Sequence, residues 1–307
     1  MTAHREAIGI DIGGTVIKAV LVSGTGLVDR RLTAAADADR TRLVAGVRGV
    51  LATLLADGRE VPLCLAMAGI PHPSGRSTQF CPGDKHDIEG LDWTEALAWP
   101  VTIPVLNDAH AALLGECWTG AARGRRHVVM LTLGTGVGGA VLADGRLLRG
   151  ARGRAGHLGH LSVTEDPTRG IVGTPGTLED AIGEQTVTRR TGGRAATTAD
   201  LVSAVERGEP WAVDVWMRSV RTLSRAIASI INAFDPEVVV LGGGIAQAGP
   251  ALFDPLAAAL ASDEWRLGGE AVPVIPASLG AIAGAIGAAH HALRHAPPGD
   301  DGHLPSA

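Results

Sequence analysis

The sequence contains no tyrosine, and aromatic residues occupy only 3% of its 307 positions. Such a chain offers few of the aromatic platforms on which nucleic-acid bases stack. Positive charge is not in excess either, since 27 lysines and arginines stand against 32 acidic residues, for a formal net charge of -5. This balance argues against nucleic acid or an anionic membrane as the main partner. It still allows a small anionic ligand, because backbone amides bind phosphate without a basic surface.

Cysteine is scarce, and signals for export or membrane insertion are lacking. The cysteines are odd in number and widely spaced, which fits reduced cytosolic thiols better than a disulfide framework. They are Cys64, Cys81 and Cys117. The opening residues MTAHREAIGI lack the basic start and the uninterrupted apolar core of a signal peptide. No apolar run is long and polar-free enough to span a bilayer. We therefore expect a cytoplasmic protein whose partners are small molecules.

The length and a hydrophobic share of 46% allow one large domain or two ordinary ones. Short β-prone runs at 7–12 and 16–22 flank Gly13-Gly14-Thr15, and a run at 127–133 precedes a second glycine-rich turn and a hairpin. The segments IGIDIGGTVIKAVLV and VVMLTLGTGVGGAVLA thus form a weak internal repeat of strand, Gly/Thr turn and strand. Helices are expected over about 177–191, 197–206, 210–234 and 280–294.

The spacing G-x-G-x-x-G occurs at Gly134, Gly136 and Gly139. A dinucleotide-binding fingerprint needs a helix after this turn and an acidic residue about 20 positions further on, whereas here a β-hairpin follows and no convincing acidic residue stands there. A Walker A loop is excluded because no Gly-Lys-Ser/Thr follows. The two turns could instead hold one polyphosphate from both sides, with backbone N–H groups and the hydroxyls of Thr15 and Thr135 as donors. Two ordinary β-turns are the alternative.

The chain resembles the ROK sugar kinases, which are bacterial glucokinase-like members of the actin/hexokinase ATPase superfamily. The matching segments follow the family order: DIGGTVIKAVL at 11–21, NDAHAALLGE at 107–116, LTLGTGVGGAVL at 131–142, AGHLGH at 155–160 and VVVLGGGIA at 238–246. The resemblance implies an α/β, two-domain actin-like ATPase (ribonuclease H-like) fold with a central cleft. The expected domains are a smaller one at 1–106 plus 283–296 and a larger one at 107–282, followed by a disordered tail at 297–307. ATP, Mg²⁺ and a homodimer are implied as well.

Phosphoryl transfer depends on positioning, charge neutralisation and a base for the acceptor hydroxyl. By the resemblance, Asp108 is this catalytic base at the sugar's primary hydroxyl, and Asn107 binds a neighbouring hydroxyl; a helix N-cap is the alternative use of Asp108. Asp11 is placed to hold Mg²⁺ through water, while the role of Lys18 is left open. The residues expected to bind the nucleotide are Asp11, Gly13, Gly14, Thr15, Gly134, Thr135, Gly136, Gly138, Gly139, Gly242, Gly243 and Gly244. A purely structural turn is the competing explanation of the last three.

The sequence also departs from the family pattern on the sugar side. His157 stands where the family has a sugar-binding Glu, and a Cys-x-Cys-Gly-x-x-Gly-Cys zinc motif is replaced in GIVGTPGTLED. Its cysteine positions hold Gly170, Val172 and Thr177. Without thiolates we expect no structural zinc, so that His160 keeps only a sugar contact. Glu179 matches another sugar-binding Glu of the family. The loop 81–93 adds a collective set of candidates, Asp84, His86 and Asp87.

These departures lie where carbons two and three of a sugar would be recognised, while Asn107-Asp108 is intact. An amine at carbon three could give protons to the acidic loop or to a neutral His157. The notable candidate is therefore kanosamine (3-amino-3-deoxyglucose), an antibiotic precursor, with plain glucose close behind and N-acylmannosamine or fructose kinases as alternatives. A sugar-sensing regulator is the non-enzyme alternative. The regulators carry a DNA-binding winged helix before the first phosphate motif, and here Asp11 comes after ten residues.

Overall fold

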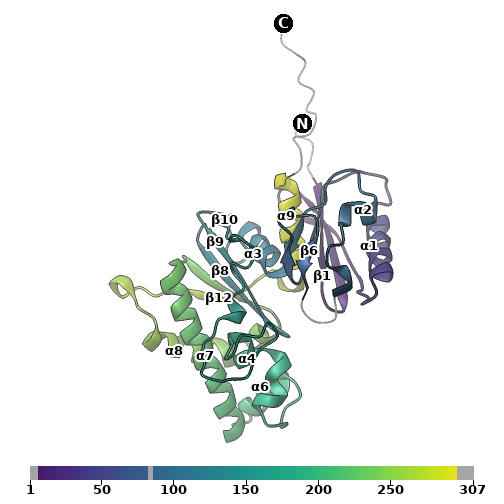
Figure 1. Ribbon diagram of the computed structural model, residues 1–307. Helices are drawn as coiled ribbons and strands as arrows, with labels where there is room; N and C mark the ends of the chain where they lie inside the picture. Colours follow the sequence, from purple (N-terminus) through teal and green to yellow (C-terminus); the bar gives the residue numbers. More distant parts are fainter. Residues whose placement is uncertain (1–5, 82–85, 296–307) are drawn as a thin grey trace. The chain divides into compact units, whose positions relative to one another are not determined.

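The structure is a computed structural model that describes residues 6–81 and 86–295 (Figure 1). The chain divides into two compact units: residues up to Trp118 together with those from Ile282 form the first, and Thr119–Ala281 form the second. We expected the first boundary after residue 106, so the observed division differs by assigning helix α3 (Asp108–Trp118) to the first unit. The tail at 297–307 lies outside the described residues.

The first unit is built on a five-stranded sheet in the order β3-β2-β1-β4-β7. The pairs β3–β2 and β2–β1 are antiparallel, whereas β1–β4 and β4–β7 are parallel. The strands are β1 (Glu6–Ile12), β2 (Val16–Ser23), β3 (Val28–Ala35), β4 (Leu63–Met67) and β7 (Val105–Asn107). A separate two-stranded sheet consists of β5 (Ile70–Pro71) and β6 (Thr78–Phe80).

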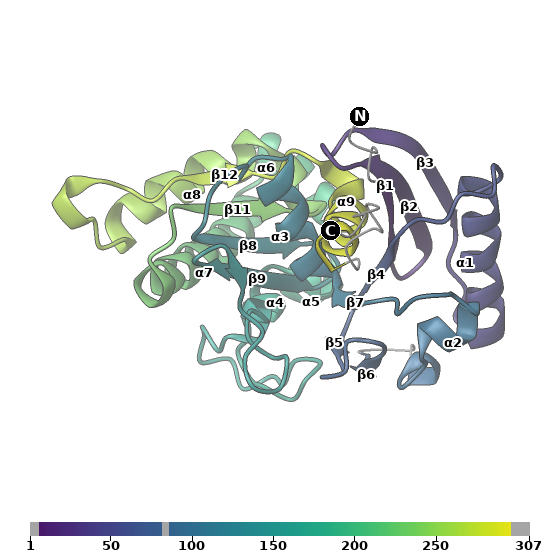
Figure 2. The same ribbon diagram turned by 90° about the horizontal axis from the view of Figure 1, so that it is seen from above.

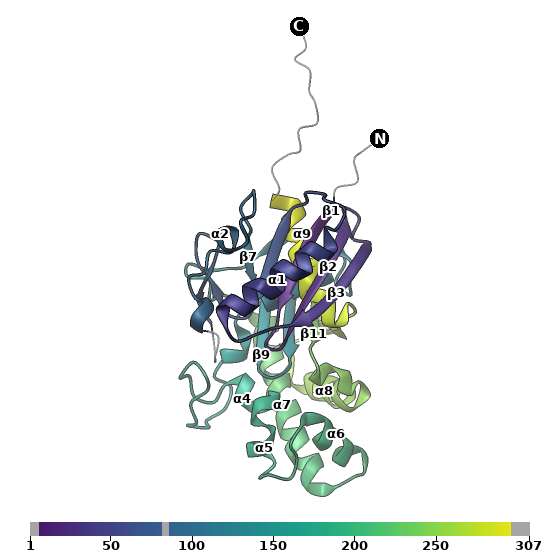
Figure 3. The same cartoon turned by 90° about the vertical axis from the view of Figure 1, so that its right-hand side faces the viewer.

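Helices cover this sheet. Helix α1 (Arg40–Leu54) begins at its N-cap Asp39 and buries apolar side chains at helical spacing, among them Leu43, Val47 and Leu54. Figure 3 shows α1 crossing one face of the strands β1–β3. Helix α9 (Ala283–His295) packs on β1 and on α3, and the short helix α2 (Trp93–Leu97) contacts α1.

The approach of α9 to its neighbours depends on glycine. A Cβ placed on Gly9 of β1 would lie 1.9 Å from the carbonyl oxygen of Ala285 in α9. A Cβ on Gly287 would lie 1.7 Å from the carbonyl oxygen of Ala111 in α3. Only hydrogen fits at these positions, because the backbones themselves are in contact. This close packing ties α3 to α9 and explains why α3 belongs to the first unit.

The second unit repeats the sheet topology of the first. Its strands run in the order β10-β9-β8-β11-β12, again with two antiparallel pairs followed by two parallel pairs. Figure 2 shows β9, β8, β11 and β12 side by side in this order. The strands are β8 (Val128–Leu133), β9 (Val137–Ala143), β10 (Arg146–Leu147), β11 (Val238–Gly242) and β12 (Val274–Pro276). The internal repeat in the sequence therefore corresponds to two topologically equivalent sheets.

The apolar core of the second unit combines its sheet with a group of helices. They are α4 (Leu178–Ile182), α5 (Val187–Arg190), α6 (Thr198–Glu206), α7 (Pro210–Phe234) and α8 (Pro250–Asp263). Helix α7 packs against α4, α6 and α8 (Figure 1). Single 3-10 turns occur at His86–Ile88, Leu158–His160, Glu184–Thr186, Ile245–Ala248, Leu267–Gly269 and Gly280–Ile282.

The expectation of one continuous helix over 177–191 is wrong. Helix α4 ends at Ile182, and Gly183 adopts an extended conformation with ψ of 149°. A Cβ on Gly183 would come within 2.7 Å of the carbonyl oxygen of Glu179 and 3.1 Å of that of Thr135. The backbone leaves the helix here because the next N–H groups bind the turn after β8.

No helix within residues 6–81 and 86–295 is both long and apolar enough to cross a membrane.

Candidate functional site

The first glycine turn connects β1 to β2. Gly13 donates its N–H to the carbonyl oxygen of Val16 at 3.0 Å, and both Gly14 and Thr15 are exposed. Nothing lies within 4 Å of a Cβ placed on Gly14. One side of the turn is therefore open to a ligand, as a phosphate-binding turn requires.

Asp11 lies near this turn and is paired with Lys18. The two residues are register partners in β1 and β2, and Nζ of Lys18 lies 3.5 Å from Oδ2 of Asp11. A Cβ on Gly284 at the start of α9 would lie 3.0 Å from Cγ of Asp11, so the carboxylate is wedged against that helix. Its side chain is only 12% exposed. The predicted contact of Asp11 with a magnesium ion stays a prediction. Lys18, whose role was left open, is the counter-charge of Asp11.

The segment Asn107-Asp108 marks the passage from β7 into α3. Asn107 is buried, its Oδ1 accepts the N–H of His110 at 3.1 Å, and its Nδ2 donates to the carbonyl oxygen of Gly69 at 3.0 Å. Asn107 therefore caps α3, the task that the sequence offered as an alternative for Asp108. Asp108 is exposed, and its Oδ1 accepts the N–H of Ala109 at 2.8 Å. Its Oδ2 has no hydrogen-bond partner within the described part of the chain.

The second glycine turn connects β8 to β9. Gly134 donates to the carbonyl oxygen of Gly136 at 2.9 Å, and nothing lies within 4 Å of a Cβ placed on Gly134. Thr135 at the tip is exposed. Gly138 and Gly139, also expected to bind nucleotide, lie within β9 opposite Thr132 and Leu131.

Close packing explains why position 139 holds a glycine. Its Cβ would lie 2.5 Å from the carbonyl oxygen of Gly156 and 2.8 Å from Cβ of Leu158. Gly139 therefore seats the 156–160 segment on β9, and its predicted phosphate contact stays a prediction.

The backbone after α4 supports this second turn. The N–H groups of Glu184 and Gln185 donate to the carbonyl oxygens of Gly134 and Thr135 at 2.9 and 3.0 Å. Glu179, only 7% exposed, accepts the N–H of Val137 on Oε2 and the side-chain amide of Gln185 on Oε1, both at 2.9 Å. Glu179 therefore holds the turn in place. Each carboxylate oxygen can accept a second hydrogen bond, so its predicted sugar contact stays a prediction.

The third glycine segment, Gly242–Gly244, ends β11. Gly243 has φ of 88°, and its Cβ would lie 2.2 Å from the carbonyl oxygen of Leu133 at the end of β8. A Cβ on Gly242 would lie 2.9 Å from Cε of Met130. These two glycines allow strands to approach, whereas Gly244 has nothing within 4 Å of its Cβ position and is exposed.

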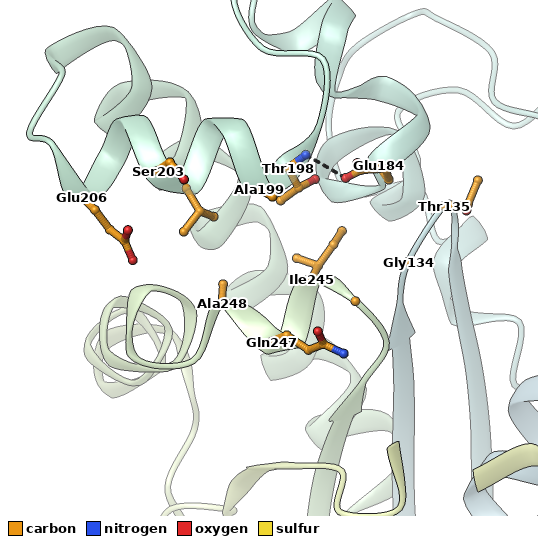
Figure 4. A pocket seen from close by; sticks show the side chains of 12 residues that line it. Gly134, Thr135, Glu184, Thr198, Ala199, Ser203, Glu206, Ile245, Gln247 and Ala248 are labelled. Atoms are coloured by element: carbon orange, nitrogen blue, oxygen red, sulfur yellow. Dashed lines mark hydrogen bonds between the residues drawn. The ribbon is translucent and has the colours of Figure 1, made fainter. Parts of the chain in front are cut away.

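A pocket of about 630 Å³ joins two of these segments within the second unit (Figure 4). Its size is in the range of small-molecule sites. It is lined by Gly134, Thr135, Glu184, Thr198, Ala199, Val202, Ser203, Glu206, Gly244, Ile245, Gln247 and Ala248. Gly134, Thr135 and Gly244 were predicted as site residues, whereas Glu184, the residues of α6 and the 3-10 turn after Gly244 were not. A capping box of Thr197 and Asp200 fixes the start of α6, and this local signal could have placed Thr198 at a helix start but not in a pocket.

The two predicted sugar-side histidines lie together. The rings of His157 and His160 are nearly parallel, at an interplanar angle of 9°, with centroids 6.3 Å apart. Nδ1 of His160 is buried and has no hydrogen-bond partner in the part of the chain that the structure describes. A Cβ on Gly159 would lie 1.8 Å from the carbonyl oxygen of Val137, so this turn sits directly on the start of β9. His160 could therefore bind a polar ligand group.

The segment aligned with the zinc motif is held by hydrogen bonds. Thr177 caps α4 by accepting the N–H of Asp180, and its hydroxyl donates to Oδ2 of Asp180 at 2.7 Å. A Cβ on Gly170 would lie 2.7 Å from the same Oδ2. In the described ranges, no three His, Cys, Asp or Glu side chains lie close enough to hold a metal ion. The expectation that zinc is absent stays a prediction.

The structure describes only part of the 81–93 loop, in which Asp84, His86 and Asp87 are the candidate residues. Asp84 and the side chain of His86 lie outside the described residues, and Asp87 is exposed at the 3-10 turn. A neighbour missed by the sequence reasoning, Glu89, accepts the N–H of Cys81 on Oε1 at 2.8 Å.

The sheets define the class of protein: an α/β fold of two equivalent units, each with a glycine turn after its first strand. A model of the ROK family matches residues 7–295. A glucokinase of Thermotoga maritima is 34% identical over 279 residues, which cover 82% of this chain and 86% of the relative.

Solved structures agree with this match. The ROK hexokinase of Thermus thermophilus is 30% identical with a TM-score of 0.79, covering 93% of this chain and 97% of that chain. A ROK family glucokinase of Streptomyces griseus, in complex with glucose and AMPPNP, is 27% identical with a TM-score of 0.78, covering 94% and 99%. The chain belongs to the ROK family, as one of its sugar kinases, and the resemblance found in the sequence and the actin-like α/β fold that it implied are confirmed.

Proposed function

We propose that this protein transfers the γ-phosphoryl group of ATP to the 6-hydroxyl of a glucose-like hexose. The observation that carries the proposal is the pocket in which Gly134-Thr135 and Gly244 meet, because two glycine segments far apart in the sequence form one cavity there. The Streptomyces griseus relative binds glucose and AMPPNP, which supports the same pair of ligands for this chain.

The residues present fit a nucleotide with its metal ion. The sides of Gly14, Gly134 and Gly244 where a Cβ would stand are open, so a phosphate could come close to the backbone there. The N–H of Gly134 is already bonded within its turn, so the donors to a phosphate would be other N–H groups of these segments. ATP supplies the transferred phosphoryl group, and Mg²⁺ neutralises charge on its phosphates. Asp11 would hold the ion through water, since Lys18 and α9 limit direct access to its carboxylate.

Asp108 is the proposed base. Its carboxylate is exposed at the start of α3, where the Ala109 N–H fixes Oδ1 and leaves Oδ2 to accept the proton of the sugar hydroxyl. Asn107 is held rigidly by its bonds to His110 and Gly69, and one hydrogen of its Nδ2 is left to donate to a neighbouring hydroxyl.

The proposed substrate is the aminosugar kanosamine, with glucose as the second candidate. His157 carries an imidazole where the family has a carboxylate, and its neighbour His160 is expected to keep only a sugar contact. A neutral imidazole nitrogen can accept a hydrogen bond from an amine or a hydroxyl. The homodimer implied by the family stays a prediction.

A coupled assay of ADP release tests the proposal. Initial rates are compared for glucose, mannose, allose, glucosamine, N-acetylmannosamine, kanosamine and fructose at matched concentrations, with ATP and Mg²⁺ in excess. We expect the highest kcat/KM for kanosamine or glucose and a product phosphorylated at the 6-hydroxyl. A preference for N-acetylmannosamine would refute the reading of His157. Sugar binding without turnover of any sugar would favour a regulator.

A further inference from the structure

The pocket of the second unit has an unusual charge for a site next to phosphate. Two of its lining residues are carboxylates, Glu184 and Glu206, and its lining contains neither lysine nor arginine. Figure 4 shows Glu206 and Ser203 of α6 at one end of the pocket and Gly134 and Thr135 at the opposite end.

Glu184 is fixed between these ends by a hydrogen bond. Its Oε2 accepts the N–H of Thr198 at 2.9 Å, while Oε1 has no partner among the residues that the structure describes. Thr198 is only 5% exposed, and its Oγ1 is buried without a hydrogen-bond partner in the described ranges. Buried polar atoms are rarely left unpaired, so the Thr198 hydroxyl is suited to bind a polar group of a ligand.

The chemistry of the lining distinguishes two kinds of phosphoryl donor. Carboxylate oxygens only accept hydrogen bonds at neutral pH, and the hydroxyls of a ribose and the amine of adenine can donate them. Inorganic polyphosphate offers only acceptors and negative charge, so Glu184 and Glu206 would repel it. The pocket also has an apolar part suited to a base, formed by Ala199, Val202, Ile245 and Ala248.

We propose that Glu184 and Glu206, which line the pocket where the proposed function would put the nucleoside of the donor, restrict the kinase to nucleoside triphosphates by excluding inorganic polyphosphate. The inference rests on the proposed function, which places the phosphates at Gly134-Thr135. Glu184 and Glu206 are thus specificity-determining residues for the donor, whereas the sugar is recognised elsewhere.

The test measures binding, which needs no turnover. Calorimetry compares the affinities of ADP and of tripolyphosphate, both with Mg²⁺, for the wild type and for the double variant Glu184→Gln/Glu206→Gln. Glutamine at 184 can still accept the N–H of Thr198 through its oxygen, so α6 should keep its start. Glu270→Gln is the control, because Glu270 is an exposed carboxylate of the same unit that does not line the pocket.

We expect the wild type and the control to bind ADP at least tenfold more tightly than tripolyphosphate. In the double variant the ratio of the two affinities should fall at least threefold. The carboxylates no longer repel tripolyphosphate, and the hydroxyl and amine groups of ADP no longer meet charged hydrogen-bond acceptors. A smaller ratio in the wild type, or a smaller change in the double variant, would overturn the inference. ADP binding with these ratios but without phosphorylation of any sugar would refute the proposed function instead.

Discussion

The role of Glu179 in holding the second glycine turn makes a strong prediction for the isosteric variant Glu179→Gln. The carboxylate accepts the N–H of Val137 on one oxygen and the amide of Gln185 on the other. Glutamine has only one oxygen, so its NH₂ group must face one of these two donors. The amide should turn its oxygen to Val137, which is buried, and its NH₂ group to Gln185, which is exposed and can turn its own oxygen to accept. Both hydrogen bonds then join neutral groups.

The magnitude follows from the loss of charge on the acceptor of both hydrogen bonds. A hydrogen bond to a charged group contributes about 1.5–3 kcal/mol, whereas one between neutral groups contributes about 0.5–1.5 kcal/mol. We therefore expect Glu179→Gln to lower the free energy of unfolding by about 2 kcal/mol. In a unit of this size that corresponds to a fall in Tm of about 4–8 °C. Because Val137 follows Gly136 directly, the KM for ATP should rise as well.

The double variant Glu179→Gln/Gln185→Glu provides the decisive comparison. It exchanges the two groups, so that the amide at 179 donates to the carboxylate at 185 and still accepts from Val137. Thermal and urea unfolding should show it more stable than either single variant, since Gln185→Glu alone places two carboxylates together. The exposed Glu270→Gln serves as the control for loss of charge. A Glu179→Gln protein as stable as the wild type, or no recovery in the double variant, would refute the reasoning.

Three further predictions concern the base, a glycine and a half-buried histidine. Asp108→Asn should lower kcat by about 10²–10⁴-fold in the ADP-release assay while sugar affinity measured by calorimetry changes little, and substantial residual turnover would remove Asp108 as the base. Gly243→Ala should destabilise the fold by about 3 kcal/mol, because a residue at φ of 88° is strained and its Cβ meets the Leu133 carbonyl at 2.2 Å. Gly244→Ala, with open space around its Cβ, should leave urea unfolding unchanged, and equal effects of the two would contradict this reading. Partial burial is the larger cause that lowers the pKa of His290 from 6.5 to about 4, and nearby positive charge is the smaller one. Between about pH 6.5 and pH 4 the unfolded chain therefore binds this proton more readily than the folded chain, and the free energy of unfolding should fall as the pH drops through that range. A His290→Gln variant, whose Tm is measured across the same range, should show a weaker dependence of Tm on pH.

Local patterns predicted much of the fold. The hairpin predicted after the second glycine-rich turn forms at Asp144-Gly145, with φ of 52° and 74°, because an Asp-Gly pair favours the left-handed conformations that a two-residue turn needs. Helix α7 spans the expected residues, since its apolar positions follow helical spacing over many turns. The repeated strand-turn-strand segments appear as the first strands of two equivalent sheets.

Predictions failed where distant backbone decided the local conformation. The helix expected over 177–191 breaks at Gly183 because the N–H groups of Glu184 and Gln185 bind carbonyls of the glycine turn, which lies far away in the sequence. The spacing of the glycines also gave no sign that Gly139 packs against Gly156, which is a second reason for a glycine there beside the predicted phosphate contact. Periodicity within a segment carries no information about such contacts.

The sequence by itself determined the strands, their glycine turns and the carboxylate at the start of α3, because period, turn propensity and helix capping act between near neighbours. Only the tertiary structure decided which side chains share the pocket. Glu184, Thr198 and Gln247 come from separate elements and follow no common spacing, so the packing of α6 against the turn after β11 had to bring them together.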